Sequence, residues 1–217
     1  IEFRQNYSNL ATRPYATAFR TQDSPFDPEH IRHLVALLRL MCPGIPIHAD
    51  PATWVAEESL VDVARWLASI CLFSVPTYSM DWDRVPAEHR RLVRWWNDWY
   101  QAHRDDIHQS RLRLLSDDPR LNCLALISPR RVIAGLFAKQ PPAPVRLTGI
   151  SPRPLTLFNG TAEQALTLEL PGWQECQYQT RDLNGQPVAS GNFAESGIIE
   201  VPLAGMCELV PQGGSDT

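Results

Sequence analysis

Acidic side chains and one histidine lie at or just after the ends of several short apolar runs in the first half of the chain. Asp23 comes after "YATAFR", His48 and Asp50 come with "GIPIH", and Asp81 and Asp83 come after "LFSVPTYSM". Each run precedes an amphipathic segment, so these side chains stand where a strand would end and a helix would begin. Several carboxylates that converge on one pocket suit acid/base catalysis on a polar substrate.

Aspartate at such positions also has a purely structural explanation. Its side chain accepts hydrogen bonds from nearby backbone N–H groups, which makes it common in turns and at helix starts. Asp27 fits that explanation, because Pro28 follows at the first helical position and Glu29 lies in the first turn. For Asp23 two interpretations stay open: it closes an Asx-turn, or it projects from the strand end into the pocket.

Alternating strands and helices would position these side chains. Helical spacing predicts helices over about 28–41, 57–72 and 86–107. In the third of these, Trp95, Trp96 and Trp99 lie along one side, a stripe typical of a buried core. An initial strand followed by three strand–helix units indicates parallel βαβ packing and amounts to about half of an eight-fold barrel.

The pattern changes from about residue 111. Short strand-like runs replace the helices: "RLRLL", "NCLALIS", "RRVIAGLFA", "PLTLFNG", "ALTLELP", "ECQYQTRD", "GIIEVPL" and "CELVP". Turn formers separate them, and Asn184-Gly185 is a strong hairpin signal. The sequence therefore predicts two domains, residues 1–110 as the C-terminal part of a (β/α)8 barrel and residues 111–217 as an antiparallel β-sandwich.

Composition argues against several classes of partner. The net charge is −4 with acids and bases mixed, so no basic stripe indicates nucleic acid, and no apolar run is long enough to span a membrane. The five cysteines are scattered without zinc spacing and no secretory signal is visible. Reduced, mostly buried thiols in a cytoplasmic protein are the expectation.

Three stretches then carry a resemblance to a known family. "AFRTQDSPFDPEHIR", "GIPIHADPATW" and "LFSVPTYSMDWDRVPAEHRRLVRWWNDWYQAHRD", followed by a β-rich half ending "IIEVPLAGMCELVP", resemble the C-terminal portion of a glycoside hydrolase family 36-type α-galactosidase (melibiase). The resemblance covers nearly the whole chain. It implies a (β/α)8 barrel followed by an antiparallel β-domain, and retaining cleavage of terminal α-linked galactose by two aspartates.

The resemblance also implies roles for five residues. It places the general acid/base on Asp23, because "TQDSPFD" is similar to the family's stretch after the sixth barrel strand. It places Arg4 near the sugar, and it directs His48, Asp50 and Trp54 toward the substrate pocket. The implied partner is an oligosaccharide or glycoside substrate, with no metal and no organic cofactor; a homo-oligomer of the full-length protein stays open.

The departures from the family pattern point to a divergent branch. No Lys-x-Asp nucleophile motif is present, since Lys139 is the only lysine, and the first residue is Ile in a strand-like run. We therefore expect the nucleophile to lie outside these residues, in a longer protein. Three alternatives stay open: a non-catalytic carbohydrate-binding or structural module, a barrel glycosidase with another sugar specificity, and an unrelated βα protein whose aspartates are all caps.

Overall fold

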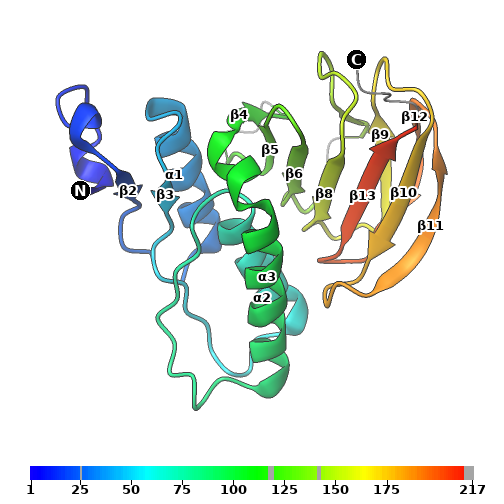
Figure 1. Ribbon diagram of the computed structural model, residues 1–217. Coiled ribbons are helices and arrows are strands. Elements are labelled where there is room, and N and C mark those ends of the chain that lie inside the picture. The colour runs from blue at the N-terminus through cyan, green and yellow to red at the C-terminus, as the bar shows by residue number, and fades with distance from the viewer. Residues whose placement is uncertain (25, 117–119, 141–142, 213–217) are drawn as a thin grey trace.

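The computed structural model describes residues 1–24, 26–116, 120–140 and 143–212, and its first part is a mixed α/β arrangement (Figure 1). Three short strands pair in parallel in the order β1 (Glu2–Arg4), β2 (Ala18–Arg20), β3 (Ile47–His48). One-turn 3-10 helices lie between β1 and β2 at Gln5–Tyr7 and Arg13–Tyr15. The helices are α1 (Pro28–Met41), α2 (Leu60–Cys71) and α3 (Ala87–Gln109).

Local capping explains where the first two helices begin. The Asp27 side chain accepts a hydrogen bond from the backbone N–H of His30 at 2.8 Å, with Pro28 at the first helical position. Ser59 accepts from the backbone N–H of Asp62 at 3.1 Å at the start of α2. The predicted role of Asp27 as a helix cap is confirmed.

The strand expected in "LFSVPTYSM" does not form as a continuous ladder. The structure has only isolated parallel bridges there, from His48 to Val75 and from Ala52 to Tyr78. Pro76 lies between the two bridges and has no backbone N–H to donate, which interrupts the hydrogen-bond ladder. The chain still runs beside β3, but through single contacts.

The second part consists of two sheets. The larger has seven strands in the order β11-β10-β13-β8-β6-β5-β4, and the smaller has three in the order β12-β9-β7. Their bounds are β4 (Arg111–Leu114), β5 (Cys123–Ile127), β6 (Val132–Leu136), β7 (Val145–Arg146), β8 (Leu155–Asn159), β9 (Ala165–Glu169), β10 (Cys176–Arg181), β11 (Pro187–Phe193), β12 (Ser196–Glu200) and β13 (Met206–Pro211).

The expectation of purely antiparallel pairing needs correction at two places. β6 pairs with β8 in parallel, and β7 pairs with β9 in parallel. The reason is the connection between β6 and β8: it carries β7 into the smaller sheet, and the chain then re-enters the larger sheet running in the same direction as β6. Parallel neighbours need such a crossover, whereas a tight hairpin would have given an antiparallel pair.

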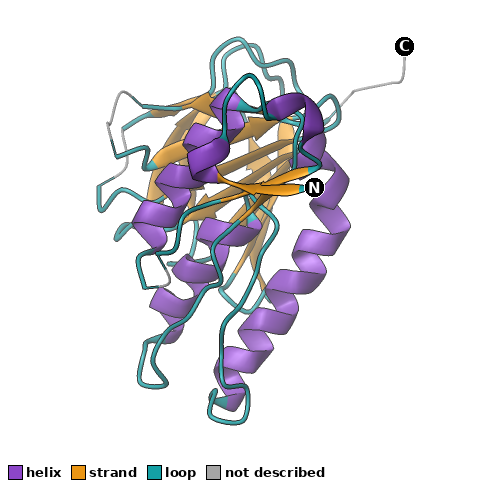
Figure 2. Ribbon diagram, turned by 90° about the vertical axis from the view of Figure 1, so that its left-hand side faces the viewer, coloured by secondary structure: helices purple, strands orange, loops and turns teal. Residues whose placement is uncertain are grey.

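The central strands β5, β6 and β8 of the seven-stranded sheet are buried on both faces. On one face Leu124, Ile133 and Phe158 join the core formed with the helices. On the other face Ala125, Val132 and Leu157 join a second core shared with the smaller sheet. Figure 2, viewed from the helical side, shows the helices in front of the strands of the second part. This explains why β5, β6 and β8 are mostly apolar along their length instead of alternating between apolar and polar residues.

Buried polar contacts also join the helices to the larger sheet. Arg32 of α1 donates to Ser69 of α2 at 3.2 Å and to the side chain of Asn122 at 2.6 Å. Its guanidinium lies 4.2 Å from the centre of the Phe137 ring, a cation–π geometry. Arg65 of α2 donates to the carbonyl oxygen of Thr161 at 2.7 Å.

The cysteine side chains are all buried and free, at Cys42, Cys71, Cys123, Cys176 and Cys207. Within the described parts of the chain, no helix combines the length and apolar character needed to cross a membrane.

Candidate functional site

Charged side chains gather on one face of the three-stranded parallel sheet. In the strand register Arg4 lies opposite Arg20, and Arg20 lies opposite His48, so these three form a row at the carboxyl ends of the strands. The residues one step earlier point to the other face, where Phe19 and Ile47 are completely buried and Phe3 is partly buried. One face therefore belongs to the core and the other carries the charges.

Asp23 bridges two arginines of this row. Its Oδ2 lies 3.4 Å from Arg4 Nη1, and its Oδ1 lies 2.6 Å from Arg20 Nη2. The Asp23 side chain is 60% exposed and the Arg4 side chain 59%. Asp23 thus stands at the strand end with its carboxylate accessible to a ligand, and its contacts run to strands β1 and β2.

Asp50 is the buried counterpart of Asp23. Its carboxylate accepts a hydrogen bond from the backbone N–H of Ser24 at 2.7 Å and lies 4.0 Å from Arg20 Nη2. Its own backbone N–H donates to the hydroxyl of Thr21 at 2.7 Å. Burial raises the pKa of Asp50 and the negative charge of Asp23 adds to this, while the Ser24 N–H and the Arg20 charge oppose it.

His48 shares the charged face but makes a different contact. Its Nδ1 lies 3.4 Å from Glu2 Oε1, and its side chain is 33% exposed. Glu2, Arg4 and Arg20 line a small groove of about 260 Å³ on this face. Four predicted residues, Arg4, Asp23, His48 and Asp50, are therefore distributed over adjoining strand ends.

Trp54 lies elsewhere. Its indole is 6% exposed and belongs to the helical core, and its Nε1 donates to His89 Nδ1 of α3 at 3.2 Å. Its remaining edge borders a separate groove of about 340 Å³. Asp81, also at an expected strand end, is exposed and pairs with Arg84 at 3.3 Å, and Asp83 is exposed in the same loop.

Sequence reasoning missed Arg20 and Glu2 as members of the site. Arg20 contacts both Asp23 and Asp50 and is the residue that links the two carboxylates. A signal was present, because the charged Arg20 directly follows Phe19 in a strand-like run, and successive side chains of a strand point to opposite faces.

The arrangement is suited to proton transfer. It pairs an exposed carboxylate with a buried one whose pKa is raised, and such pairs can divide the roles of proton donor and charged stabiliser. Among the residues that the structure describes, no group of three or more His, Cys, Asp or Glu side chains is arranged to hold a metal ion.

Comparison with known proteins gives little beyond this geometry. No family model and no curated protein matches the chain. Seven chains of solved structure match. One of them is a GH30 endoxylanase from Clostridium papyrosolvens C71, with a TM-score of 0.49 and 7% identity over 94% of this chain and 51% of that one. This chain thus spans about half the length of that structure, and a similarity this distant carries no argument about reaction or substrate.

Proposed function

We propose that the charged face of β1, β2 and β3 is part of the active site of a glycoside hydrolase, with Asp23 as the general acid/base. The observation that carries the proposal is the pairing of Asp23, exposed at the strand ends, with the buried Asp50 through the shared Arg20. Carboxyl ends of parallel strands are where barrel enzymes place catalytic side chains. From the sequence resemblance we further propose that these residues form half of a (β/α)8 barrel with a β-sandwich. We also propose that the enzyme acts on terminal α-linked galactose or a related sugar.

In the proposed reaction a carboxylate outside these residues attacks the anomeric carbon. The bond to the leaving oxygen breaks, and that oxygen takes its electron pair and the proton of Asp23. In the second step water attacks the same carbon and gives a proton to Asp23, and the nucleophilic carboxylate leaves. The configuration is retained because the carbon is inverted twice.

The neighbouring residues would support these steps. Burial raises the pKa of Asp50, so Asp50 holds its proton to higher pH than an ordinary aspartate and would add less negative charge beside Asp23. The Arg4–Asp23 contact is longer than the Arg20–Asp23 contact, and Arg4 is more exposed. Arg4 would therefore exchange this contact for sugar hydroxyls, while Arg20 keeps the two aspartates in place.

The test is the variant Asp23→Asn in the full-length protein that carries these residues. We expect kcat/KM for galactosides with a poor leaving group to fall by about 10²–10⁴, the usual contribution of a general acid/base. Activated aryl glycosides should lose less, and added azide should restore turnover by replacing water. We expect little hydrolysis from residues 1–217 alone, since the nucleophile would be missing.

Asp27→Asn is the matched control. It changes a carboxylate four positions away that caps α1, so it should leave kcat/KM unchanged. Equal activity of Asp23→Asn and the wild-type protein on a poor-leaving-group substrate would show that Asp23 only shapes the turn.

A further inference from the structure

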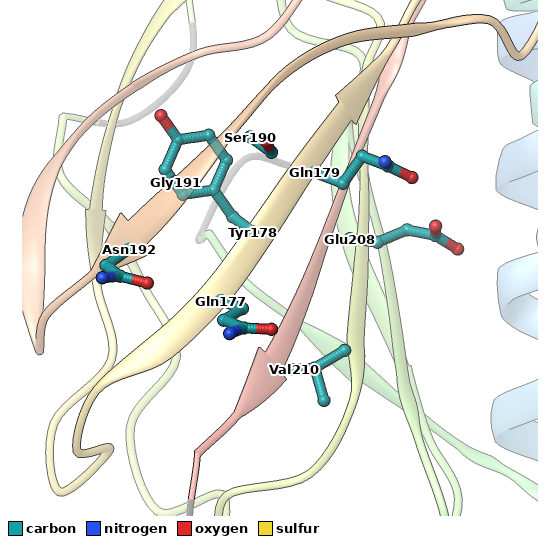
Figure 3. Close-up of a pocket in the computed structure, with 8 residues that line it drawn as sticks. All are labelled: Gln177, Tyr178, Gln179, Ser190, Gly191, Asn192, Glu208 and Val210. Carbon is teal, nitrogen blue, oxygen red and sulfur yellow. The ribbon is translucent and has the colours of Figure 1, made fainter.

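A second polar surface lies far along the chain, on one face of the seven-stranded sheet. It is a groove of about 550 Å³ over β10, β11 and β13, at the edge of the sheet that ends with β11 (Figure 3). Strand register places six side chains together on this face: Gln177, Gln179, Ser190, Asn192, Glu208 and Val210. Tyr178 points to the opposite face, where its ring lies against Gly191.

Arg181 holds part of this surface in a fixed arrangement. It donates to Gln179 Oε1 at 2.5 Å, to Glu208 Oε2 at 3.3 Å and to the carbonyl oxygen of Gly185 at 3.1 Å. These bonds occupy the oxygen of Gln179 and one oxygen of Glu208. The amide N–H groups of Gln179 and the second oxygen of Glu208 are left for a ligand, and Figure 3 shows these two side chains projecting side by side.

The neighbouring strand repeats the pattern. Gln212 donates to Asn192 Oδ1 at 3.4 Å, which leaves the amide N–H groups of Asn192 for a ligand. Adjacent strands are about 4.8 Å apart and same-face residues along a strand about 7 Å apart, so donors and acceptors recur on the scale of one sugar ring.

The chemistry of the groove selects among ligands. Amides, a hydroxyl and one carboxylate offer hydrogen bonds of both kinds, and the charge of Arg181 is opposed by that of Glu208. Anionic ligands find no excess positive charge here. A protein partner would need an apolar centre, and of the six side chains that the register places on this face only Val210 is apolar. We propose that this groove binds a neutral carbohydrate chain, at a site separate from the charged face of β1–β3.

Affinity electrophoresis of the full chain tests the proposal. The gels contain galactomannan, arabinoxylan or dextran as neutral probes, and polygalacturonate as the anionic comparison. We expect at least one neutral polysaccharide to slow migration. Gln179→Ala and Asn192→Ala should each weaken that binding about 5-fold, the effect of losing one hydrogen bond. The control Gln164→Ala changes an exposed amide outside the groove and should bind like the wild-type protein.

Two further outcomes separate this site from the proposed active site. Arg4→Ala should leave retardation unchanged, because Arg4 lies on the β1–β3 face; loss of binding in that variant would assign the sugar to the other site and overturn the groove. The proposal also fails if no neutral polysaccharide slows the chain, if polygalacturonate alone does, or if both groove variants bind normally while thermal melts show them folded.

Discussion

At the scale of single residues, Asp50 gives a pH-dependent prediction. Its pKa is raised in the folded protein, mainly by burial, so the folded state keeps a proton on Asp50 to higher pH than the unfolded chain. The stabilising contribution of Asp50 is therefore complete below the unfolded aspartate value of about 3.9 and is lost as the pH rises through the folded pKa. Asparagine does not titrate but can still accept the Ser24 N–H.

The measurement is urea denaturation of the wild-type protein and Asp50→Asn over a pH series. The free energy of unfolding of the wild type, relative to the variant, should fall as the pH increases from about 3 to about 7. A difference that grows in favour of the wild type with increasing pH would mean that Asp50 is held as a stabilised carboxylate, and would contradict the burial argument.

The aspartates also show what sequence can predict at this scale. The cap formed by Asp27 depends on backbone groups within three residues, so proline and glutamate beside it were sufficient to predict it. The contact of Arg20 with Asp50 depends on the pairing of β2 with β3, which brings together residues thirty positions apart. The local sequence does not show which strands pair or in which register. Neither this contact nor the burial of Asp50 could therefore be predicted from it.

At the scale of elements, the β10–β11 hairpin docks onto α3 through a glycine. Gly185 has a φ of +77°, which L side chains rarely adopt, and a Cβ there would overlap the indole of Trp95. We expect Gly185→Ala to cost the left-handed penalty of about 1–2 kcal/mol and, in addition, the displacement of Trp95. Equilibrium denaturation measures the loss of stability.

Gly172→Ala is the matched comparison for this hairpin prediction. Gly172 has a similar φ of +81°, but nothing lies within 4 Å of the added methyl group. It should therefore show the backbone penalty alone, about 1–2 kcal/mol. Equal losses in the two variants would show that the hairpin moves away from α3 at no cost.

Elements differed in how well the sequence predicted them. The three helices have long periodic faces and recognisable starts, and Asn184-Gly185 does form the turn of the β10–β11 hairpin. Asn159-Gly160 carries the same dipeptide, but β8 and β9 belong to different sheets, and the buried Asn159 side chain instead bonds Thr161 and the Val201 carbonyl. β11 was missed because its small and polar residues form an exposed edge strand without an apolar pattern.

At the scale of the molecule, the change in pattern near residue 111 marks a change of secondary structure, while the packing continues across it. Trp96 of α3 meets Phe158 of β8 at 5.6 Å between ring centres, and one core cluster contains both. The sequence shows where helices give way to strands, because that is a local property. It does not show which strand faces will be covered by helices, because this depends on the crossover that makes β6 and β8 parallel.

The shared sheet predicts that the chain unfolds as one unit. Phe158 packs toward the helices and its neighbour Leu157 toward the smaller sheet, and both are fully buried. Replacing either with alanine should cost about 2–5 kcal/mol. Because both residues belong to the same strand, each variant should lower the stability of both halves equally.

Two spectroscopic signals separate the halves. All tryptophans except Trp173 precede residue 111, so near-UV circular dichroism mainly follows the helical part, whereas far-UV circular dichroism follows both helices and strands. We expect the two signals to change together in denaturant for the wild-type protein, Phe158→Ala and Leu157→Ala. Leu157→Ala could instead lose part of its far-UV signal in denaturant while its near-UV signal persists. That outcome would show that the two halves are separate folding units. The predicted division into residues 1–110 and 111–217 would then be a thermodynamic boundary as well as a change of sequence pattern.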